Sequence, residues 1–258
     1  MPSNSSWFPL LKPNSGALLR LFCFPYSGAG ASAFYAWPNS LPSDIEVCPI
    51  QLPGREIRLA EPPFTSLAPL VHTLAHVILV GLDKPFAFFG HSMGALVSFE
   101  VARHLRRRYG LRPAHLFVSG YGAPHIARRD QPISSLPEPE FLAKLRHLNG
   151  TPEDVLEHAE LRDIILPILR ADFAVCETYV YETDDPLDCP ISAFGGLEDY
   201  EVSRDQLEAW REQTSSSFSV RMFPGDHFYL NTARPLVLRI LAQELSQIVS
   251  KIAAETKV

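Results

Sequence analysis

The chain has 258 residues, of which 46% are hydrophobic and 20% are charged, and its formal net charge is −6. This composition is typical of a globular protein, and the length allows a large apolar core without disulfides or metal ions. The negative charge argues against nucleic acid as the main partner. No apolar stretch approaches the roughly 18 residues of a membrane span, and the first residues do not resemble a signal peptide. We therefore expect a cytoplasmic protein that does not act at a membrane.

Strand-like and helix-like segments alternate along the chain. Several short runs are apolar at nearly every position, which is typical of strands buried on both faces of a parallel sheet. The predicted strands are 17–24, 45–52, 85–90, 115–120, 189–196 and 218–225. Helical patterns occupy 67–82, 94–108, 203–213 and 235–252. This alternation predicts an α/β fold, with a mainly parallel sheet flanked by helices.

The alternation breaks between the strands at 115–120 and 189–196. The intervening segment shows two helical patterns, 136–148 and 151–180, the second interrupted by Pro167. A helical segment of this length is too long for a simple connector. We predict a helical lid insertion over about 127–185, within a single domain that spans residues 1–258. Its apolar side chains, among them Leu142, Leu145, Leu166 and Phe173, are expected to roof a substrate chamber and to move when substrate enters.

Four cysteines, Cys23, Cys48, Cys176 and Cys189, are scattered along the chain without a C-x-x-C pair. Three of them lie in or beside apolar runs, where a free cysteine usually behaves as a small buried hydrophobe. We expect core thiols rather than a redox or metal site.

Residues 90–94, GHSMG, form a G-x-S-x-G motif. Ser92 directly follows the apolar strand at 85–90 and directly precedes the helix at 94–108, which is the context of a nucleophile elbow. The two glycines suit a strained turn at which flanking side chains would collide. We predict that Ser92 is a nucleophile; the alternative is an ordinary serine between two turn glycines.

A serine nucleophile requires a general base, and His227 is the best placed of nine histidines. It follows the last predicted strand, and in a parallel sheet the loop after a strand lies at the same edge as the elbow. Seven other histidines are interpreted as surface or core residues: His72, His76, His91, His104, His115, His147 and His158.

Asp199 is the predicted acid that orients the base, because it follows the penultimate strand at the same sheet edge. Glu198 is the adjacent alternative. Asp226 directly precedes His227, and this spacing is too short for its carboxylate to reach the imidazole ring easily. The order Ser92, Asp199, His227 is that of the α/β-hydrolase fold, which we predict for this chain.

The oxyanion hole of such a site uses two backbone N–H groups. The first predicted donor is Met93, which follows the nucleophile. The second is Ser27, in the loop after the strand at 17–24, with Tyr26 as the alternative. Gly28 and Gly30 lie in this loop, but no third glycine follows at the spacing of a dinucleotide site.

Five sequence blocks resemble the type II thioesterases, stand-alone α/β-hydrolases that serve polyketide synthases, non-ribosomal peptide synthetases and, in animals, medium-chain fatty acid synthesis. The blocks are LFCFPYSGAGASAFYAW (21–37), QLPGRE (51–56), KPFAFFGHSMGAL (84–96), GGLEDYEV (195–202) and PGDHFYL (224–230). The family often has His-Ala-Gly-Gly at positions 26–29 and Gly at position 226, where this chain has Tyr-Ser-Gly-Ala and Asp. Both departures leave the backbone donors and the triad in place. For QLPGRE, the resemblance favours a structural role near the active-site edge over mere surface charges.

The resemblance implies a serine thioesterase that acts on acyl groups carried by phosphopantetheine carrier domains, either clearing stalled or aberrant groups or releasing medium-length chains. No metal or cofactor is implied, because the protein itself supplies nucleophile, base and oxyanion hole. Two alternatives remain open: a carboxylesterase or lipase with the same triad, and a non-catalytic carrier-binding protein. We expect a monomer.

Two arginine clusters are candidates for the site that docks an acidic carrier domain. Arg103 and residues 106–108 end the helix that starts at the elbow, roughly 22 Å from Ser92, where they complement the negative end of the helix dipole. Arg128 and Arg129 follow the strand at 115–120 and therefore lie at the active-site edge. We predict that these two arginines dock the carrier.

Overall fold

One six-stranded sheet organises the protein in the computed structural model, which describes residues 6–126 and 132–255. The strands are β1 (Leu19–Phe24), β2 (Ile45–Pro49), β3 (Phe86–His91), β4 (Leu116–Ser119), β5 (Ile191–Gly196) and β6 (Phe218–Phe223). They pair in the order β2-β1-β3-β4-β5-β6, and every pair is parallel. All six predicted strands are present, and the predicted parallel α/β fold is confirmed.

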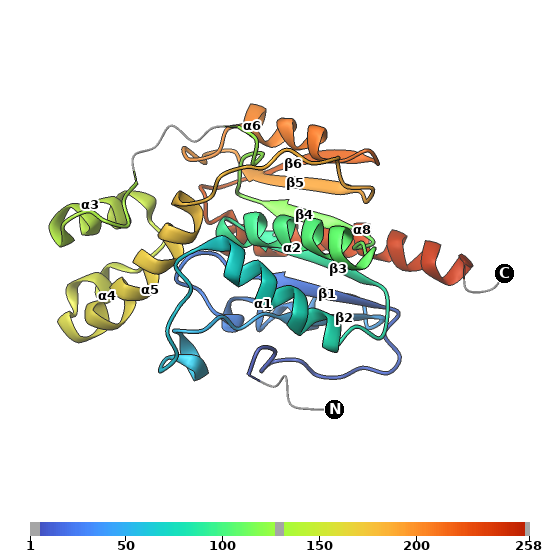
Figure 1. The fold of residues 1–258 in the computed structure, drawn as a ribbon, viewed down its shortest axis with the longest axis horizontal. Coiled ribbons are helices and arrows are strands. Elements are labelled where there is room, and N and C mark those ends of the chain that lie inside the picture. The colour runs from blue at the N-terminus through green and yellow to red at the C-terminus, as the bar shows by residue number, and fades with distance from the viewer. Residues whose placement is uncertain (1–5, 127–131, 256–258) are drawn as a thin grey trace.

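Helices cover both faces of this sheet. α1 (Leu67–Val80) and α2 (Met93–Tyr109) lie across one face, and α8 (Arg234–Glu255) lies across the other (Figure 1). Successive strand side chains point to opposite faces, so Phe88 joins the core under α1 and α2 while Phe89 joins the core under α8. This two-sided burial explains why the central strands are apolar at nearly every position.

Short helical segments complete the fold. They are η1 (Ala31–Phe34), η2 (Trp37–Asn39), η3 (Glu56–Arg58), α6 (Arg204–Glu208), η4 (Ala209–Gln213) and α7 (Tyr229–Thr232). The pattern at 203–213 predicted one helix, whereas the structure tightens from α-helix to 3-10 helix at Ala209. With three residues per turn, positions i and i+3 share a side, and this places both Trp210 and Gln213 in the interior.

The segment between β4 and β5 forms α3 (Glu138–Leu148), α4 (Glu153–Glu157) and α5 (Ala159–Glu177). These helices lie together beyond one end of the sheet (Figure 1). They share an apolar cluster whose buried members are Phe141, Leu145, Leu156, Leu166 and Leu169. The expected interruption at Pro167 is wrong, since α5 continues through it and the break falls at His158 instead. Pro167 is exposed, so the carbonyl group that lacks its helical partner can be hydrated.

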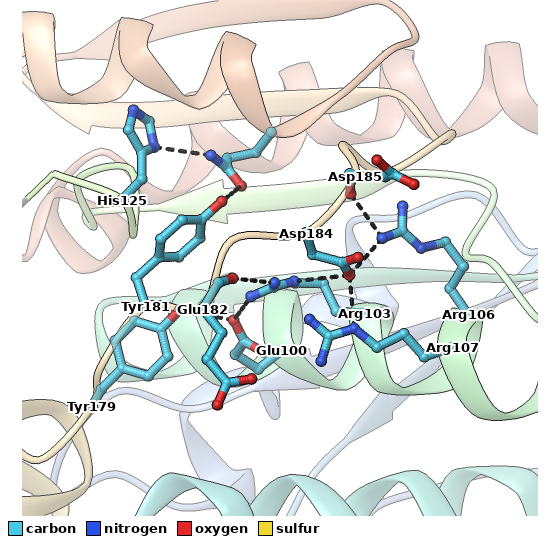
Figure 2. A network of polar contacts seen from close by, with 11 residues as sticks. Glu100, Arg103, Arg106, Arg107, His125, Tyr179, Tyr181, Glu182, Asp184 and Asp185 are labelled. Carbon is cyan, nitrogen blue, oxygen red and sulfur yellow. Dashed lines mark hydrogen bonds and ion pairs between the residues drawn. The ribbon is translucent and has the colours of Figure 1, made fainter.

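The chain that leads from α5 back to β5 is fastened to the C-terminal half of α2. Asp184 binds Arg106 and Arg107, both at 2.7 Å, and Arg103 lies 3.6 Å away (Figure 2). Burial alone would raise the pKa of Asp184, but hydrogen bonds from Arg107, from the backbone at Asp185 and from Arg106 lower it to about 2. The arginines that we expected to complement the helix dipole therefore also hold a neighbouring segment in place.

Candidate active site

Ser92 stands on a sharp turn between β3 and α2, with φ of 52° and ψ of −120°. This conformation is strained for a residue with a side chain. A Cβ on Gly90 would collide with the carbonyl of Gly94, and a Cβ on Gly94 would collide with the carbonyls of Phe24 and Pro25. Both motif glycines are therefore required by close backbone packing, and the turn has the geometry of a nucleophile elbow.

The structure brings Ser92, His227 and Asp199 into one hydrogen-bonded chain. His227 Nε2 lies 3.0 Å from Ser92 Oγ, and His227 Nδ1 lies 2.9 Å from Asp199 Oδ2. A carboxylate accepts hydrogen bonds, so the proton of a neutral His227 belongs on Nδ1. Nε2 is then free to accept the proton of the serine hydroxyl, which is the arrangement of a general base beside a nucleophile.

Asp199 is itself held by the backbone. Its side chain is fully buried, and Oδ1 accepts hydrogen bonds from the N–H groups of Glu201 (2.8 Å) and Val202 (3.1 Å). Asp226 instead accepts from the N–H of Phe228 at 2.8 Å. The contact with the imidazole ring is thus made by Asp199, and neither Asp226 nor Glu198 makes it among the described residues.

The loop after β1, residues 25–32, lies against the start of α2, because Gly94 packs on the Phe24 and Pro25 carbonyls. We call it the oxyanion loop. The N–H groups of Ser27 and Met93 have no acceptor among residues 6–126 and 132–255. Both are therefore available to a substrate oxygen above Ser92, as backbone donors of an oxyanion hole must be.

A cavity of about 210 Å³ adjoins His227. Its lining comes from the end of α3, the Asp199 loop and the His227 loop, and comprises His147, Leu148, Asn149, Glu198, Asp199, Tyr200, Glu201, Asp226 and His227. The loop after α3 touches the His227 loop directly, since a Cβ on Gly150 would collide with the ring of Phe228. The helical insertion thus reaches the site, and His147, which we interpreted as a surface or core residue, faces this cavity.

His91 was not recognised from the sequence as part of the site. It is fully buried, its Nδ1 lies 2.8 Å from Ser119 Oγ, and Ser119 Oγ lies 2.5 Å from the hydroxyl of Tyr229. Its ring centroid is 5.2 Å from that of His227. Burial, and secondarily the neighbouring His227, hold the pKa of His91 well below its usual value, so this ring stays neutral. Its position at the end of a wholly apolar strand was the sequence signal for burial.

Asp172 was also missed, and no partner was predicted for Arg55. Arg55 belongs to QLPGRE and Asp172 to α5, and their side chains pair through two hydrogen bonds of 2.6 and 2.8 Å. Asp172 also accepts the N–H of Gly28 at 2.7 Å. QLPGRE therefore lies at the active-site edge, as the resemblance implied. The predicted docking residues Arg128 and Arg129 lie outside the described residues.

The described residues hold no group of three or more histidine, cysteine, aspartate or glutamate side chains arranged for a metal ion. All four cysteines are buried, and burial raises the pKa of Cys189 to about 12. Within the same residues, no helix has the length and apolar character needed to cross a bilayer.

The thioesterase-domain family model matches residues 19–245, and the chain belongs to this family. The gramicidin S biosynthesis protein GrsT of Aneurinibacillus migulanus is 52% identical over 241 residues, which cover 93% of this chain and 94% of that protein. The fold matches the solved structure of RedJ, a thioesterase of the prodiginine pathway in Streptomyces coelicolor, with a TM-score of 0.83, 40% identity and 94% coverage of both chains. It matches BorB, the type II thioesterase of the borrelidin cluster, with a TM-score of 0.83, 35% identity and coverage of 91% and 95%. The resemblance to type II thioesterases and the α/β-hydrolase fold are confirmed.

Proposed function

We propose that this protein is a type II thioesterase that hydrolyses acyl thioesters on the phosphopantetheine arms of carrier domains, in a pathway of non-ribosomal peptide or polyketide synthesis. The observation that carries the proposal is the hydrogen-bonded chain of Ser92, His227 and Asp199, in a member of the thioesterase family. GrsT is named for gramicidin S biosynthesis and BorB for the borrelidin biosynthetic cluster, and the structurally similar YbtT is a type II thioesterase from the yersiniabactin NRPS/PKS pathway. These names support the pathway class.

In the first half of the reaction, Ser92 Oγ attacks the thioester carbonyl while His227 Nε2 takes the hydroxyl proton. The carbonyl oxygen becomes an oxyanion, which the N–H groups of Met93 and Ser27 stabilise. The start of α2 adds its positive dipole end at the same place. When the tetrahedral intermediate collapses, the C–S bond breaks, the sulfur leaves with the proton from His227, and an acyl-serine remains.

In the second half, His227 takes a proton from a water molecule, whose oxygen attacks the acyl-serine carbonyl. The bond between the acyl carbon and Ser92 Oγ then breaks, the proton returns from His227 to Ser92 Oγ, and the free acid leaves. Asp199 keeps the His227 proton on Nδ1 and stabilises the imidazolium that forms twice in the cycle. The triad residues all come from one chain, which supports a catalytically complete monomer built as one domain.

We further propose that the acids released are stalled or aberrant acyl groups. A site that accepts varied acyl groups would suit this role. A strong preference for one medium-length chain would instead favour product release.

The proposal is tested by comparing acyl-carrier domains, acyl-pantetheine thioesters and matched oxygen esters as substrates for the wild type and for Ser92→Ala. We expect thioester turnover that Ser92→Ala abolishes, together with covalent labelling by a fluorophosphonate in the wild type alone. Faster turnover of oxygen esters would favour a carboxylesterase. If the wild type showed neither turnover nor labelling, the result would favour the alternative of a non-catalytic carrier-binding protein.

A further inference from the structure

The oxyanion loop is fixed from outside by side chains of two distant segments. Three of these side chains belong to QLPGRE and one to α5. The contacts are Gly28 N–H to Asp172 Oδ2 (2.7 Å), Arg55 Nη1 to Ala29 O (3.2 Å), Ala31 N–H to Gln51 Oε1 (3.0 Å) and Ser32 Oγ to Glu56 Oε1 (2.6 Å). Four of the five residues from Gly28 to Ser32 are therefore held in place by a side chain that is not part of the loop.

Arg55 and Asp172 form the centre of this arrangement. The guanidinium and carboxylate groups meet in a two-pronged contact, and the residues are 4% and 2% exposed. Two parallel charge-assisted hydrogen bonds fix direction as well as distance. The pair is 117 residues apart in sequence, so it ties the insertion to the loop that follows β2.

Two residues of this arrangement, Gly28 and Glu56, have positive φ angles. Gly28 has a φ of +80°, a conformation that other residues rarely adopt. Glu56 has a φ of 49° although it carries a side chain, and its carboxylate accepts both the hydroxyl and the N–H of Ser32. Strained backbone persists where surrounding contacts over-determine it.

α5 presents one face to the loop. Ile165, Leu169 and Asp172 are spaced i, i+4 and i+7, which places them on one side of a helix. A Cβ on Gly28 would meet Leu169 Cδ2 at 2.7 Å and Ile165 Cδ1 at 3.9 Å. Leu169 therefore packs on Gly28 while Asp172, one turn further on, accepts its N–H.

We infer that the Arg55–Asp172 pair positions the oxyanion hole and makes its alignment depend on how α5 packs against the oxyanion loop. The inference rests on the proposed function, in which the Ser27 N–H is an oxyanion donor. Asp172 fixes the peptide that joins Ser27 to Gly28, which directly follows the peptide carrying the Ser27 N–H, and Arg55 fixes the carbonyl of Ala29, two residues after Ser27. Both contacts therefore restrict the orientation of Ser27. Arg55 and Asp172 are positioning residues, since they act on the oxyanion through the backbone.

The consequence is a link between the insertion and catalysis. When α5 packs against the oxyanion loop, the Ser27 N–H is aligned. When α5 moves away from the loop, Gly28 loses both its hydrogen-bond acceptor, Asp172, and its packing partner, Leu169. A misplacement of about 1 Å at a catalytic group can reduce a rate by roughly 100-fold.

The test uses the double variant Arg55→Met with Asp172→Leu, because replacing a buried ion pair by apolar side chains often preserves stability. Three quantities are measured in the full-length enzyme: kcat/KM on an acyl-pantetheine thioester, the Ki of the matching trifluoromethyl ketone, and the Kd of the non-hydrolysable amide. The ketone forms a tetrahedral adduct with Ser92 and so reports on the oxyanion hole, whereas the amide reports on ground-state binding. We expect kcat/KM to fall about 10- to 100-fold, because one donor is misaligned rather than removed. The ketone Ki should rise in the same proportion, and the amide Kd should change less than 3-fold.

Arg170→Gln is the matched control, because Arg170 lies on α5 two residues before Asp172 and donates to Ser134 O rather than to the oxyanion loop. It should leave the ratio of ketone Ki to amide Kd at the wild-type value. If the double variant does not fold, Arg55→Lys, which keeps the charge but not the two-pronged contact, should show the same selective rise in ketone Ki to a smaller degree. A folded variant with wild-type ketone Ki, or with equal losses for ketone and amide, would overturn the inference. Ser92→Ala in the same assay separates the two proposals, since activity in Ser92→Ala would reject the proposed function itself.

Discussion

Asp199 Oδ2 lies 2.9 Å from Nδ1 of His227, while Glu198, one residue earlier in the chain, lines the neighbouring cavity. We expect Asp199→Asn to lower kcat on the order of 10⁴-fold, because an amide can present N–H to the ring and favour the wrong tautomer. Glu198→Gln should lower it less than 3-fold. Steady-state kinetics on one acyl-pantetheine thioester checks both. A collapse of activity in Glu198→Gln with near-normal turnover in Asp199→Asn would transfer the acid role to Glu198.

The buried Ser119 hydroxyl joins His91 to Tyr229 and should matter for stability. Ser119→Ala leaves Nδ1 of His91 and the hydroxyl of Tyr229 without their common partner, and unsatisfied buried polar groups cost about 1–3 kcal/mol each. We expect a fall of roughly 2–4 kcal/mol in the free energy of unfolding. Tyr229→Phe is the matched control, since it keeps the bond between Ser119 and His91 and should cost less. Urea unfolding at pH 7.5 measures both, and equal losses would contradict the network.

The lowered pKa of His115 predicts that the stability of the protein depends on pH. Its Nε2 lies 2.9 Å from Ser192 Oγ, its ring stacks on Phe117, and burial, with a minor contribution from Lys251, lowers its pKa from 6.5 to about 4. Between these values the unfolded chain binds a proton at this site that the folded protein does not bind. Stability is therefore lost as the pH falls from about 6.5 to about 4, and the loss is complete below that range.

The corresponding experiment compares the wild type with His115→Gln in urea at pH 7 and pH 5. The wild type should lose about 2 kcal/mol more than the variant between these two pH values, because one pKa unit corresponds to about 1.4 kcal/mol. The buried His91 contributes to both proteins equally and cancels in the difference. Identical pH dependence in both would show that the pKa of His115 is the same in the folded and unfolded states, which would contradict the prediction.

Hydrogen exchange should divide the insertion into two parts. Asp172, Leu169 and the neighbouring residues fix the second half of α5 to the oxyanion loop, so its amides should exchange as slowly as those of β3. α3 and α4 pack chiefly within their own cluster and should exchange faster. Uniformly slow exchange over 133–177 would rule out a moving lid, and fast exchange throughout α5 would contradict the fixed half.

Carrier docking remains a prediction for Arg128 and Arg129. The double variant Arg128→Glu with Arg129→Glu should raise KM for acyl-carrier substrates and leave KM for acyl-pantetheine unchanged, because only the carrier brings an acidic surface. Lys144→Glu, on α3, is the control for a general charge effect. Equal effects on both substrates, or no effect on either, would remove these arginines from the docking surface.

Most of the fold was predictable because buried parallel strands leave a strong local signal. Phe88 and Phe89 face opposite cores, so the whole β3 run had to be apolar. The site residues could be located by the same reasoning, since Ser92 directly follows β3 while Asp199 and His227 lie in the loops after β5 and β6, and these loops meet at one edge of the sheet.

The contacts that hold the site in place were not predictable in this way. Asp172 is an ordinary polar position in an amphipathic helix, and its pairing with Arg55 depends on how the insertion folds over the sheet edge. His91 was ambiguous because a histidine at a variable motif position gives no sign of its partner on β4. Pro167 was misinterpreted because the sequence does not show that Pro167 lies on the exposed side of α5, where water can bind the carbonyl that lacks its helical partner.

The fastening of Asp184 to α2 has a mechanical consequence. This contact lies between α5 and β5, and β5 ends at the loop that presents Asp199. We therefore expect a displacement of the insertion to be absorbed at this contact before it reaches β5, so that the distance between Asp199 and His227 would stay constant if the insertion moved. Such an arrangement would let the enzyme accept acyl groups of different bulk while the geometry of proton transfer between Ser92, His227 and Asp199 stays the same.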